Sequence, residues 1–343
     1  MLLWIEGFEG FGTSVGSPPS PTNVLARVYS TVISESTMDI EAGRLGGYCL
    51  KLDATSNAIR SPALTTNSTL VVGCAVKFGY ALTLCRFLSF LDGVTLGMNV
   101  RLTVAGELSV YRGTTLLATT VGLNLLLNAW YYIEFKVTCN ATTGSYELRV
   151  GEVTVLSAAG VNTKAGSNDY HTTFVLERDA ASTTYLDDMY CLDSSGSVNN
   201  DFLGNSRVSA IYPNGDTASK AWDRSAGADN YALVDEAIVN DDTDYVESGD
   251  VGDKDLYDYG AVSGVTTVVR GLQINTMCRE TDVTPFNLIT VAKAGTTESE
   301  DVGQAVGTTN YVSKRRIVEL DPDTGVAWTV SGVNAAQFGI KVG

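Results

Sequence analysis

The chain is a series of strand-length runs separated by turn residues, and almost no segment repeats its apolar residues at the helical period. Turn signals recur about every 8–12 residues, a spacing typical of a β-sandwich or jelly roll. One of them is the hairpin dipeptide Asp92-Gly93. The strands predicted in the first part of the chain cover residues 70–78, 86–91, 94–104, 107–112, 115–121, 130–138, 146–150, 153–156 and 184–192.

The length of the chain favours two domains. A chain of 343 residues is too long for one ordinary hydrophobic core, and the polar, turn-rich residues 193–201 suit a linker or an excursion. We predict an all-β protein in which residues 1–206 form a jelly-roll β-sandwich and residues 207–343 a second, smaller β-rich sandwich domain. The strands predicted in the second domain cover residues 207–212, 265–274, 286–291, 311–320, 328–330 and 338–342.

Helices contribute little to this prediction. A short helical turn is expected near residues 217–222, and no helix of more than two turns is predicted. No apolar run approaches the roughly 20 residues of a membrane-spanning helix. The first residues also lack the basic region and the long apolar region of a signal peptide.

The chain is acidic and sparsely charged. It carries 23 Lys and Arg against 39 Asp and Glu, a net charge of −16, and charged residues make up only 18% of it. Such a chain repels phosphate backbones and anionic lipid head groups. The charge balance therefore disfavours nucleic acid and membrane surfaces as partners.

The chain contains a single histidine, His171, so most catalytic designs that need an imidazole base are poorly supported. No Gly-x-Ser-x-Gly motif accompanies it. We expect His171 to occupy a polar loop or a strand end and to have no catalytic role.

Paired carboxylates are the catalytic arrangement that the composition leaves open, because glycoside hydrolysis needs only two Asp or Glu side chains. Asp187-Asp188 is the obvious pair. Adjacent strand residues point to opposite faces of a sheet, so these two are not expected to flank one bond. We favour a structural role in which at least one of them holds a turn, a backbone amide or an arginine.

The acidic residues 235–258 are candidate calcium ligands. Asp242-Thr243-Asp244 begins like a calcium-binding loop, but Val246 stands where the third ligand belongs and Glu247 replaces the loop glycine. An EF-hand is therefore excluded. A looser calcium site stays open beside the more common outcome, a solvated acidic loop.

No cofactor is predicted. Residues 10–16 have the wrong glycine spacing and no lysine for a phosphate-binding loop, and their glycines more readily let an early strand bend. No cysteines are spaced as Cys-x-x-Cys, so zinc ribbons and thioredoxin chemistry are disfavoured. Buried reduced thiols are expected over disulfides for the six cysteines, Cys49, Cys74, Cys85, Cys139, Cys191 and Cys278.

Several motifs occur in a specific order along the chain. They are residues 4–9 (WIEGFE), 43–50 (GRLGGYCL), 71–78 (VVGCAVKF), 130–135 (WYYIEF) and 185–190 (YLDDMY). This order resembles concanavalin A-like, laminin-G-like jelly rolls. The continuation, residues 201–208 (DFLGNSRV), 212–216 (YPNGD) and 322–329 (PDTGVAWT), is similar to virion structural proteins of tailed bacteriophages.

This resemblance implies a non-enzymatic component of a phage particle, in the tail, neck or fibre, that is assembled in the host cytoplasm. Its implied partners are other virion proteins and further copies of the same chain. Two alternatives stay open: a capsid decoration protein and a receptor module that binds a host-surface glycan. A depolymerase acting through Asp187 or Asp188 is the least favoured hypothesis.

Overall fold

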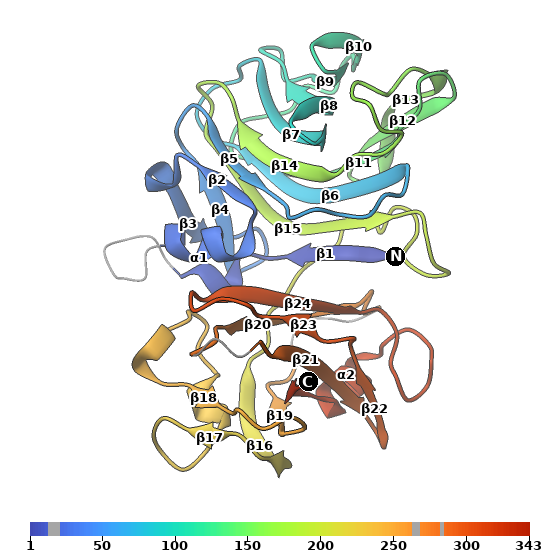
Figure 1. The fold of residues 1–343 in the computed structure, drawn as a ribbon. Helices are drawn as coiled ribbons and strands as arrows, with labels where there is room; N and C mark the ends of the chain where they lie inside the picture. The colour runs from blue at the N-terminus through green and yellow to red at the C-terminus, as the bar shows by residue number, and fades with distance from the viewer. Residues whose placement is uncertain (13–20, 263–267, 282–284) are drawn as a thin grey trace. The chain divides into compact units, whose positions relative to one another are not determined.

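The computed structural model describes residues 1–12, 21–262, 268–281 and 285–343, and divides the chain into two compact units (Figure 1). The N-terminal unit is Met1–Val208 and the C-terminal unit is Ser209–Gly343. Both are built mainly from antiparallel strands, which confirms the predicted all-β fold class. Within the described ranges, no helix is both long enough and apolar enough to cross a membrane.

The N-terminal unit is a sandwich of two antiparallel sheets. The eight-stranded sheet has the order β13 (Val153–Val161), β12 (Gly144–Val150), β11 (Trp130–Thr138), β6 (Thr69–Phe78), β15 (Thr184–Asp193), β4 (Tyr48–Leu52) and β3 (Met38–Ala42), and β1 (Leu2–Glu6) also pairs with β15. The seven-stranded sheet has the order β10 (Thr115–Thr119), β9 (Leu108–Arg112), β8 (Thr95–Leu102), β7 (Cys85–Asp92), β14 (Thr173–Arg178), β5 (Asn57–Arg60) and β2 (Thr31–Ile33).

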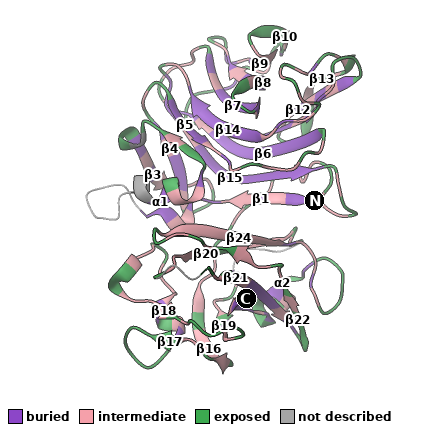
Figure 2. Ribbon diagram, in the orientation of Figure 1, coloured by how far each residue is buried: buried purple, intermediate pink, exposed green. Residues whose placement is uncertain are grey.

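The core of the N-terminal unit lies between these two sheets, where the period-two alternation of each strand places its apolar side chains. Phe78 on β6 meets Phe87 on β7 edge to face at 5.4 Å between ring centroids. Phe90 on β7 stacks on Phe135 of β11 at 5.8 Å. Figure 2 shows β6, β14 and β15 as almost continuously buried strands, which explains why residues 70–78 are apolar on both faces.

Short helical segments occur where none was predicted. In the N-terminal unit these are η1 (Glu9–Phe11), α1 (Pro21–Val28) and η2 (Glu35–Thr37). Helix α1 buries Val24 and Leu25. The glycine-rich residues 10–16 begin within η1 rather than in a bent strand, and residues 13–16 lie outside the described part of the chain.

The C-terminal unit contains a six-stranded antiparallel sheet and two smaller ones. The six-stranded sheet has the order β16 (Pro213–Lys220), β19 (Lys254–Tyr259), β25 (Gln337–Val342), β21 (Asn287–Ala294) and β22 (Thr297–Glu300), with β23 (Gln304–Ala305) also pairing β21. The two-stranded sheets are β17 (Asp223–Arg224) with β18 (Val246–Glu247) and β20 (Leu272–Cys278) with β24 (Val312–Val318). The helical segments are η3 (Tyr231–Leu233), η4 (Asp241–Thr243) and α2 (Val330–Ala335).

A separate apolar cluster forms the core of the C-terminal unit. Trp328 is buried against Phe338 of β25, and its indole N–H donates to the Val318 carbonyl of β24 at 3.1 Å. Leu272 and Ile274 of β20 pack on the same cluster. The two-stranded sheet of β20 and β24 therefore covers one face of the six-stranded sheet.

Two predictions at the start of the C-terminal unit are wrong. Residues 217–222 do not form a helical turn, because residues up to Lys220 belong to strand β16. Residues 207–212 do not form a strand. The Val208 amide donates to the Asp188 carboxylate at 2.8 Å instead of to a neighbouring strand.

Two later predictions also need correction. Residues 328–330 are not a strand, because the Thr329 hydroxyl accepts a hydrogen bond from the Gly332 amide and caps helix α2. The strand predicted at 265–274 begins only at Leu272, and residues 263–267 lie outside the described part of the chain.

Candidate functional site

The outer faces of the two N-terminal sheets differ in what covers them. Residues 194–208 run over the outer face of the eight-stranded sheet. The Gly204 amide donates to Glu134 Oε1 at 2.9 Å, and the Asn205 amide donates to Glu152 Oε1 at 3.0 Å. The Arg149 guanidinium lies 3.9 Å from the ring centroid of Phe202. The polar stretch predicted as a linker or an excursion thus continues into a strap held on this sheet.

Asp187 and Asp188 anchor the end of that strap together with Arg44. A β-bulge interrupts β15 here, and Asp188 has a left-handed backbone with φ of 50°. Asp187 Oδ2 accepts the Arg44 amide at 2.7 Å, and Asp188 Oδ2 accepts Arg44 Nε at 2.9 Å. Asp187 therefore binds the backbone of Arg44, and Asp188 binds its side chain.

Every oxygen of this carboxylate pair accepts a hydrogen bond. Besides the bonds to Arg44, Asp187 Oδ1 accepts the Asp188 amide at 2.7 Å and Asp188 Oδ1 accepts the Val208 amide at 2.8 Å. Arg44 also donates to the Ser206 carbonyl at 2.6 Å. The cluster thus ties the bulge, the loop after β3 and the strap together.

The electrostatics of the cluster reflect its burial. Burial, and then the neighbouring charge of Asp188, raise the pKa of Asp187 to about 7. Burial also raises the pKa of Asp188, although the Val208 amide and Arg44 oppose this. Glu9, which accepts the Tyr48 amide at 3.2 Å, has a pKa raised mainly by burial. Three carboxyl groups thus share one region with Arg44.

The outer face of the seven-stranded sheet carries a different set of side chains. Strand register aligns Arg60 on β5, Val175 on β14, Ser89 on β7, Asn99 on β8 and Tyr111 on β9. These residues alternate with core residues along their strands, so they share the face turned away from the sandwich core. The alignment makes one polar row across five adjacent strands.

A second row runs beside the first. Arg86 holds Glu177 through two hydrogen bonds of 2.7 Å, and Ser89 donates to the same carboxylate. Arg101 lies over the Tyr111 ring at 4.2 Å from its centroid and donates to Asn99 Oδ1 at 2.9 Å. These contacts hold the side chains in defined orientations.

Two arginines of this face, Arg60 and Arg101, make no ion pair with any described carboxylate. Arg60 donates from Nε to Thr173 Oγ1 at 3.0 Å and from NH2 to the Gly93 carbonyl. Arg101, which lies over Tyr111, and Arg60, at the other end of the row, each hold a guanidinium group that is suited to an anionic ligand. We call the residues Arg60, Ser89, Asn99, Arg101 and Tyr111 the arginine face. Ser89 and Asn99 are fully buried, so Arg60, Arg101 and Tyr111 are the members that a ligand could reach.

No motif in the sequence indicates the arginine face. Alternation within each strand could have shown that Asn99 and Arg101 share a face, and that Ser109 and Tyr111 do so as well. No local pattern shows that β5 lies beside β14, or β14 beside β7, because these pairings join distant parts of the chain.

His171 lies two residues before β14, near a strand end as one of the two expectations had it, but it is buried rather than in polar surroundings. Its ring packs on Phe90 at 5.5 Å between centroids, and neither ring nitrogen has a hydrogen-bond partner among the described residues. Burial lowers the pKa of His171 to about 4, so the imidazole is neutral at pH 7. This environment fits an apolar packing role.

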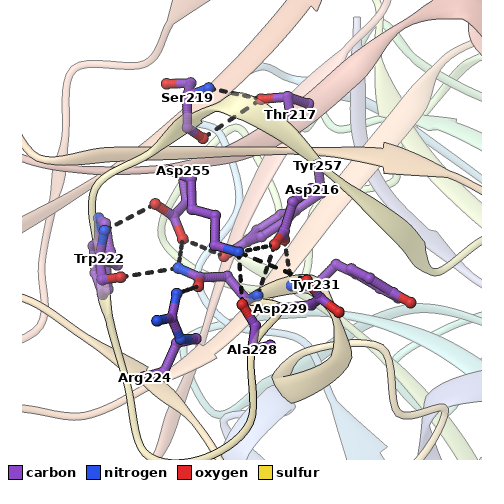
Figure 3. Close-up of polar contacts among 12 residues, drawn as sticks. Asp216, Thr217, Ser219, Trp222, Arg224, Ala228, Asp229, Tyr231, Asp255 and Tyr257 are labelled. Atoms are coloured by element: carbon purple, nitrogen blue, oxygen red, sulfur yellow. Dashed lines mark hydrogen bonds and ion pairs between the residues drawn. The ribbon is translucent and has the colours of Figure 1, made fainter.

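A buried polar cluster lies in the C-terminal unit (Figure 3). Asp255 accepts the amides of Ala221 and Trp222 at 2.7 and 2.9 Å, and its other oxygen accepts Asn230 Nδ2 and the Tyr257 hydroxyl. Three of its donors, Ala221, Trp222 and Asn230, belong to the segment that follows β16, and the fourth, Tyr257, lies on β19 itself. The cluster therefore closes the loop between β16 and β19.

The acidic residues 235–258 separate into different environments. Asp255 is fully buried, whereas Asp242 is exposed and accepts hydrogen bonds from Arg279 at 2.7 Å and Tyr311 at 2.8 Å. Across the described residues, no three His, Cys, Asp or Glu side chains converge in a group that could hold a metal ion. The six cysteines are free thiols, and all but Cys278 are buried.

No protein-family model and no curated protein matches the chain. Solved structures similar to it include an endo-β-1,4-glucuronan lyase from Trichoderma reesei, at 10% identity and TM-score 0.38, with 48% of this chain and 90% of that one covered. Alginate lyase Aly36B matches at 12% identity and TM-score 0.38, with 55% and 96% covered. A Trypanosoma rangeli sialidase mutant matches at 12% identity and TM-score 0.34, with 45% and 27% covered. Likeness at this level carries no inference about what the chain binds or does.

Proposed function

We propose that the chain is a structural subunit of a tailed-bacteriophage particle, in the tail, neck or fibre, which acts by protein–protein assembly and without turnover chemistry. The motif order of the sequence and the all-β sandwich support this proposal. The main observation behind it is that two edge strands of the sandwich carry no charge. Strand β13 forms one of the two edges of the eight-stranded sheet and β10 one of the two edges of the seven-stranded sheet, and neither strand contains a charged residue.

Uncharged edges matter because an edge strand presents unpaired backbone N–H and C=O groups to any neighbouring chain. Soluble monomers commonly protect such edges with charges, proline or bulges. Here each edge strand has β-bulges in its pairing with the adjacent strand. Residues Leu156–Ala159 of β13 nevertheless pair regularly with β12 and leave their other edge without a partner among the described strands. An assembly subunit can use this edge to extend its sheet into a neighbour.

Charges placed on the β13 edge test the proposal. We expect the purified chain to be oligomeric and the double variant Ser157→Lys/Ala159→Lys to shift towards the monomer by at least about tenfold in its association constant, because like charges would face each other across the new pairing. Both positions are exposed, so the fold should persist. Sedimentation velocity over a concentration series measures the shift.

The matched control is Thr95→Lys, an exposed position on β8, an interior strand of the seven-stranded sheet that pairs with β7 at this residue. It should leave the oligomer unchanged. Antibodies against the chain should also label phage particles in electron microscopy. A strictly monomeric chain that labels no particle would contradict the proposal.

The arginine face favours a second candidate, a receptor module that binds a host-surface glycan bearing carboxylate groups. Fixed arginines can hold carboxylates through paired hydrogen bonds, and Tyr111 offers a ring for stacking on a sugar. The charge of the whole chain opposes anions, so the local cationic groups must supply the attraction.

Under this candidate, Arg60→Ala and Arg101→Ala should each weaken binding of an acidic oligosaccharide by about tenfold or more, since a charge-assisted hydrogen bond is worth about 1.5–3 kcal/mol. Isothermal titration calorimetry measures the change, with a neutral oligosaccharide as the ligand control. Arg112→Ala, on β9 but outside the face, should bind as the wild type does. Equal binding by all variants would reject the arginine face as a binding site.

A further inference from the structure

Three loops of the N-terminal unit meet at one end of the sandwich. Cys85 pairs with Leu102 and Leu108 pairs with Leu102, so the loops at residues 79–84 and 103–107 lie at the same end of the seven-stranded sheet. Ser109 pairs with Thr119, which brings the loop at 120–129 there as well. Residues 79–84, 103–107 and 120–129 are called the loop end.

Backbone hydrogen bonds hold these loops together. The Leu125 amide donates to the Gly106 carbonyl at 2.8 Å, and the Asn128 amide donates to the Phe78 carbonyl at 2.7 Å. The Leu126 amide donates to the Tyr131 hydroxyl at 2.9 Å. The loop end is therefore a preformed surface that would lose little conformational entropy on binding.

The loop end exposes an unusual number of large apolar side chains. Val121 is 98% exposed, Tyr80 76%, Val104 72% and Leu126 66%, and Leu84 and Leu127 are also exposed. Apolar side chains concentrated in this way mark an interaction surface more often than isolated ones do.

The loop end also presents almost no charge. Glu107 is the one charged residue in these three segments. Its carboxylate accepts the amides of Gly122 at 2.9 Å and Leu123 at 3.2 Å, together with the Thr120 hydroxyl. Its charge is thus used to hold the 120–129 loop.

We propose that the loop end is the contact through which two copies of this chain associate. This proposal rests on the assembly function proposed above. A symmetric contact places each residue near its own counterpart, so a patch of one charge would repel itself. Two chains of net charge −16 repel each other over most of their surfaces. An apolar, uncharged patch is where they can approach at the lowest electrostatic cost. Anionic membranes are disfavoured as occupants by the same net charge.

The experiment places charges in the loop end. The double variant Val121→Glu/Leu126→Glu is compared with Val302→Glu, a fully exposed valine of the C-terminal unit. We expect light scattering with size-exclusion chromatography to give a dimer or a larger assembly of 36.4-kDa chains for the wild type and for Val302→Glu. The loop-end variant should dissociate to smaller species at the same concentration, with an unchanged circular dichroism spectrum.

The edge variant Ser157→Lys/Ala159→Lys separates the two proposals. If it dissociates the oligomer while Val121→Glu/Leu126→Glu does not, the loop-end contact is wrong and the assembly function stands. A wild-type chain that is monomeric at every concentration overturns both. A monomeric wild type that instead binds neutral lipid vesicles through Val121 and Leu126 overturns self-association and assigns the loop end to a membrane.

Discussion

Replacing Arg44 with alanine is expected to lower the free energy of unfolding of the N-terminal unit by about 3–5 kcal/mol, the usual effect of removing one partner of a buried ion pair. The Arg44 guanidinium lies 2.8 Å from Asp188 Oδ2, and the side chains are only 9% and 3% exposed. Without the arginine, Asp187 and Asp188 remain buried beside each other with no cation in contact. The strap also loses the hydrogen bond from Arg44 to Ser206.

Asp187 makes the stability of the N-terminal unit depend on pH. The pKa of Asp187 is about 7 in the folded chain against an ordinary value of 3.8, so the folded state binds more protons than the unfolded state between these values. The contribution of Asp187 to stability is therefore present at acid pH and is lost as the pH rises from about 4 to about 7. Asp187→Asn should remove this dependence. In Arg44→Ala the loss of stability should grow as the pH rises through about 7, because Asp187 then becomes charged beside Asp188.

Hydrogen exchange followed by mass spectrometry measures the effect, because peptides from β15 report the N-terminal unit alone. The control is Lys164→Ala, which removes a surface ion pair to Asp169, a side chain that is 62% exposed. It should cost about 1 kcal/mol or less. Equal losses for Lys164→Ala and Arg44→Ala would contradict the role assigned to the buried cluster.

In the C-terminal unit, Asp255→Ala is expected to cost about 3 kcal/mol or more. Its carboxylate is fully buried and accepts four hydrogen bonds, and each buried donor left without an acceptor costs about 1–3 kcal/mol. The loop between β16 and β19 should lose protection first, because Asn230 and Trp222 are held by this group (Figure 3).

Thermal unfolding with hydrogen exchange of β19 peptides checks this result. Asp255→Asn keeps one carbonyl oxygen for the backbone amides but turns an amide group towards Asn230 and Tyr257. We therefore expect it to lower stability less than Asp255→Ala does. Asp258→Ala is the control, since Asp258 is exposed and bonded only to Gln337 in the described hydrogen bonds. An Asp255→Ala chain as stable as Asp258→Ala would show that water replaces the carboxylate at little cost.

The strands of this protein could be predicted where the pattern is local. Residues 130–138 alternate between core and outer face and form β11 with the same bounds. Residues 86–91 and 94–104 are joined by Asp92-Gly93 and form the hairpin of β7 and β8. The predictions failed where a single contact replaced the pattern, as at Thr329, whose hydroxyl starts a helix inside a strand-like run.

The candidate sites, too, could be predicted only where the pattern is local. The sequence was sufficient to select Asp187-Asp188 and to expect an arginine or a backbone amide as partner, because an acidic pair inside an apolar run needs donors. It could not identify Arg44 or the bulge that turns both carboxylates towards it. The arginine face and the loop end depend on which strands are neighbours. Alternation and turns are set within a few residues of chain, whereas strand order and bulges result from contacts between distant segments, and only the folded sandwich brings Arg60 and Arg101 onto one face.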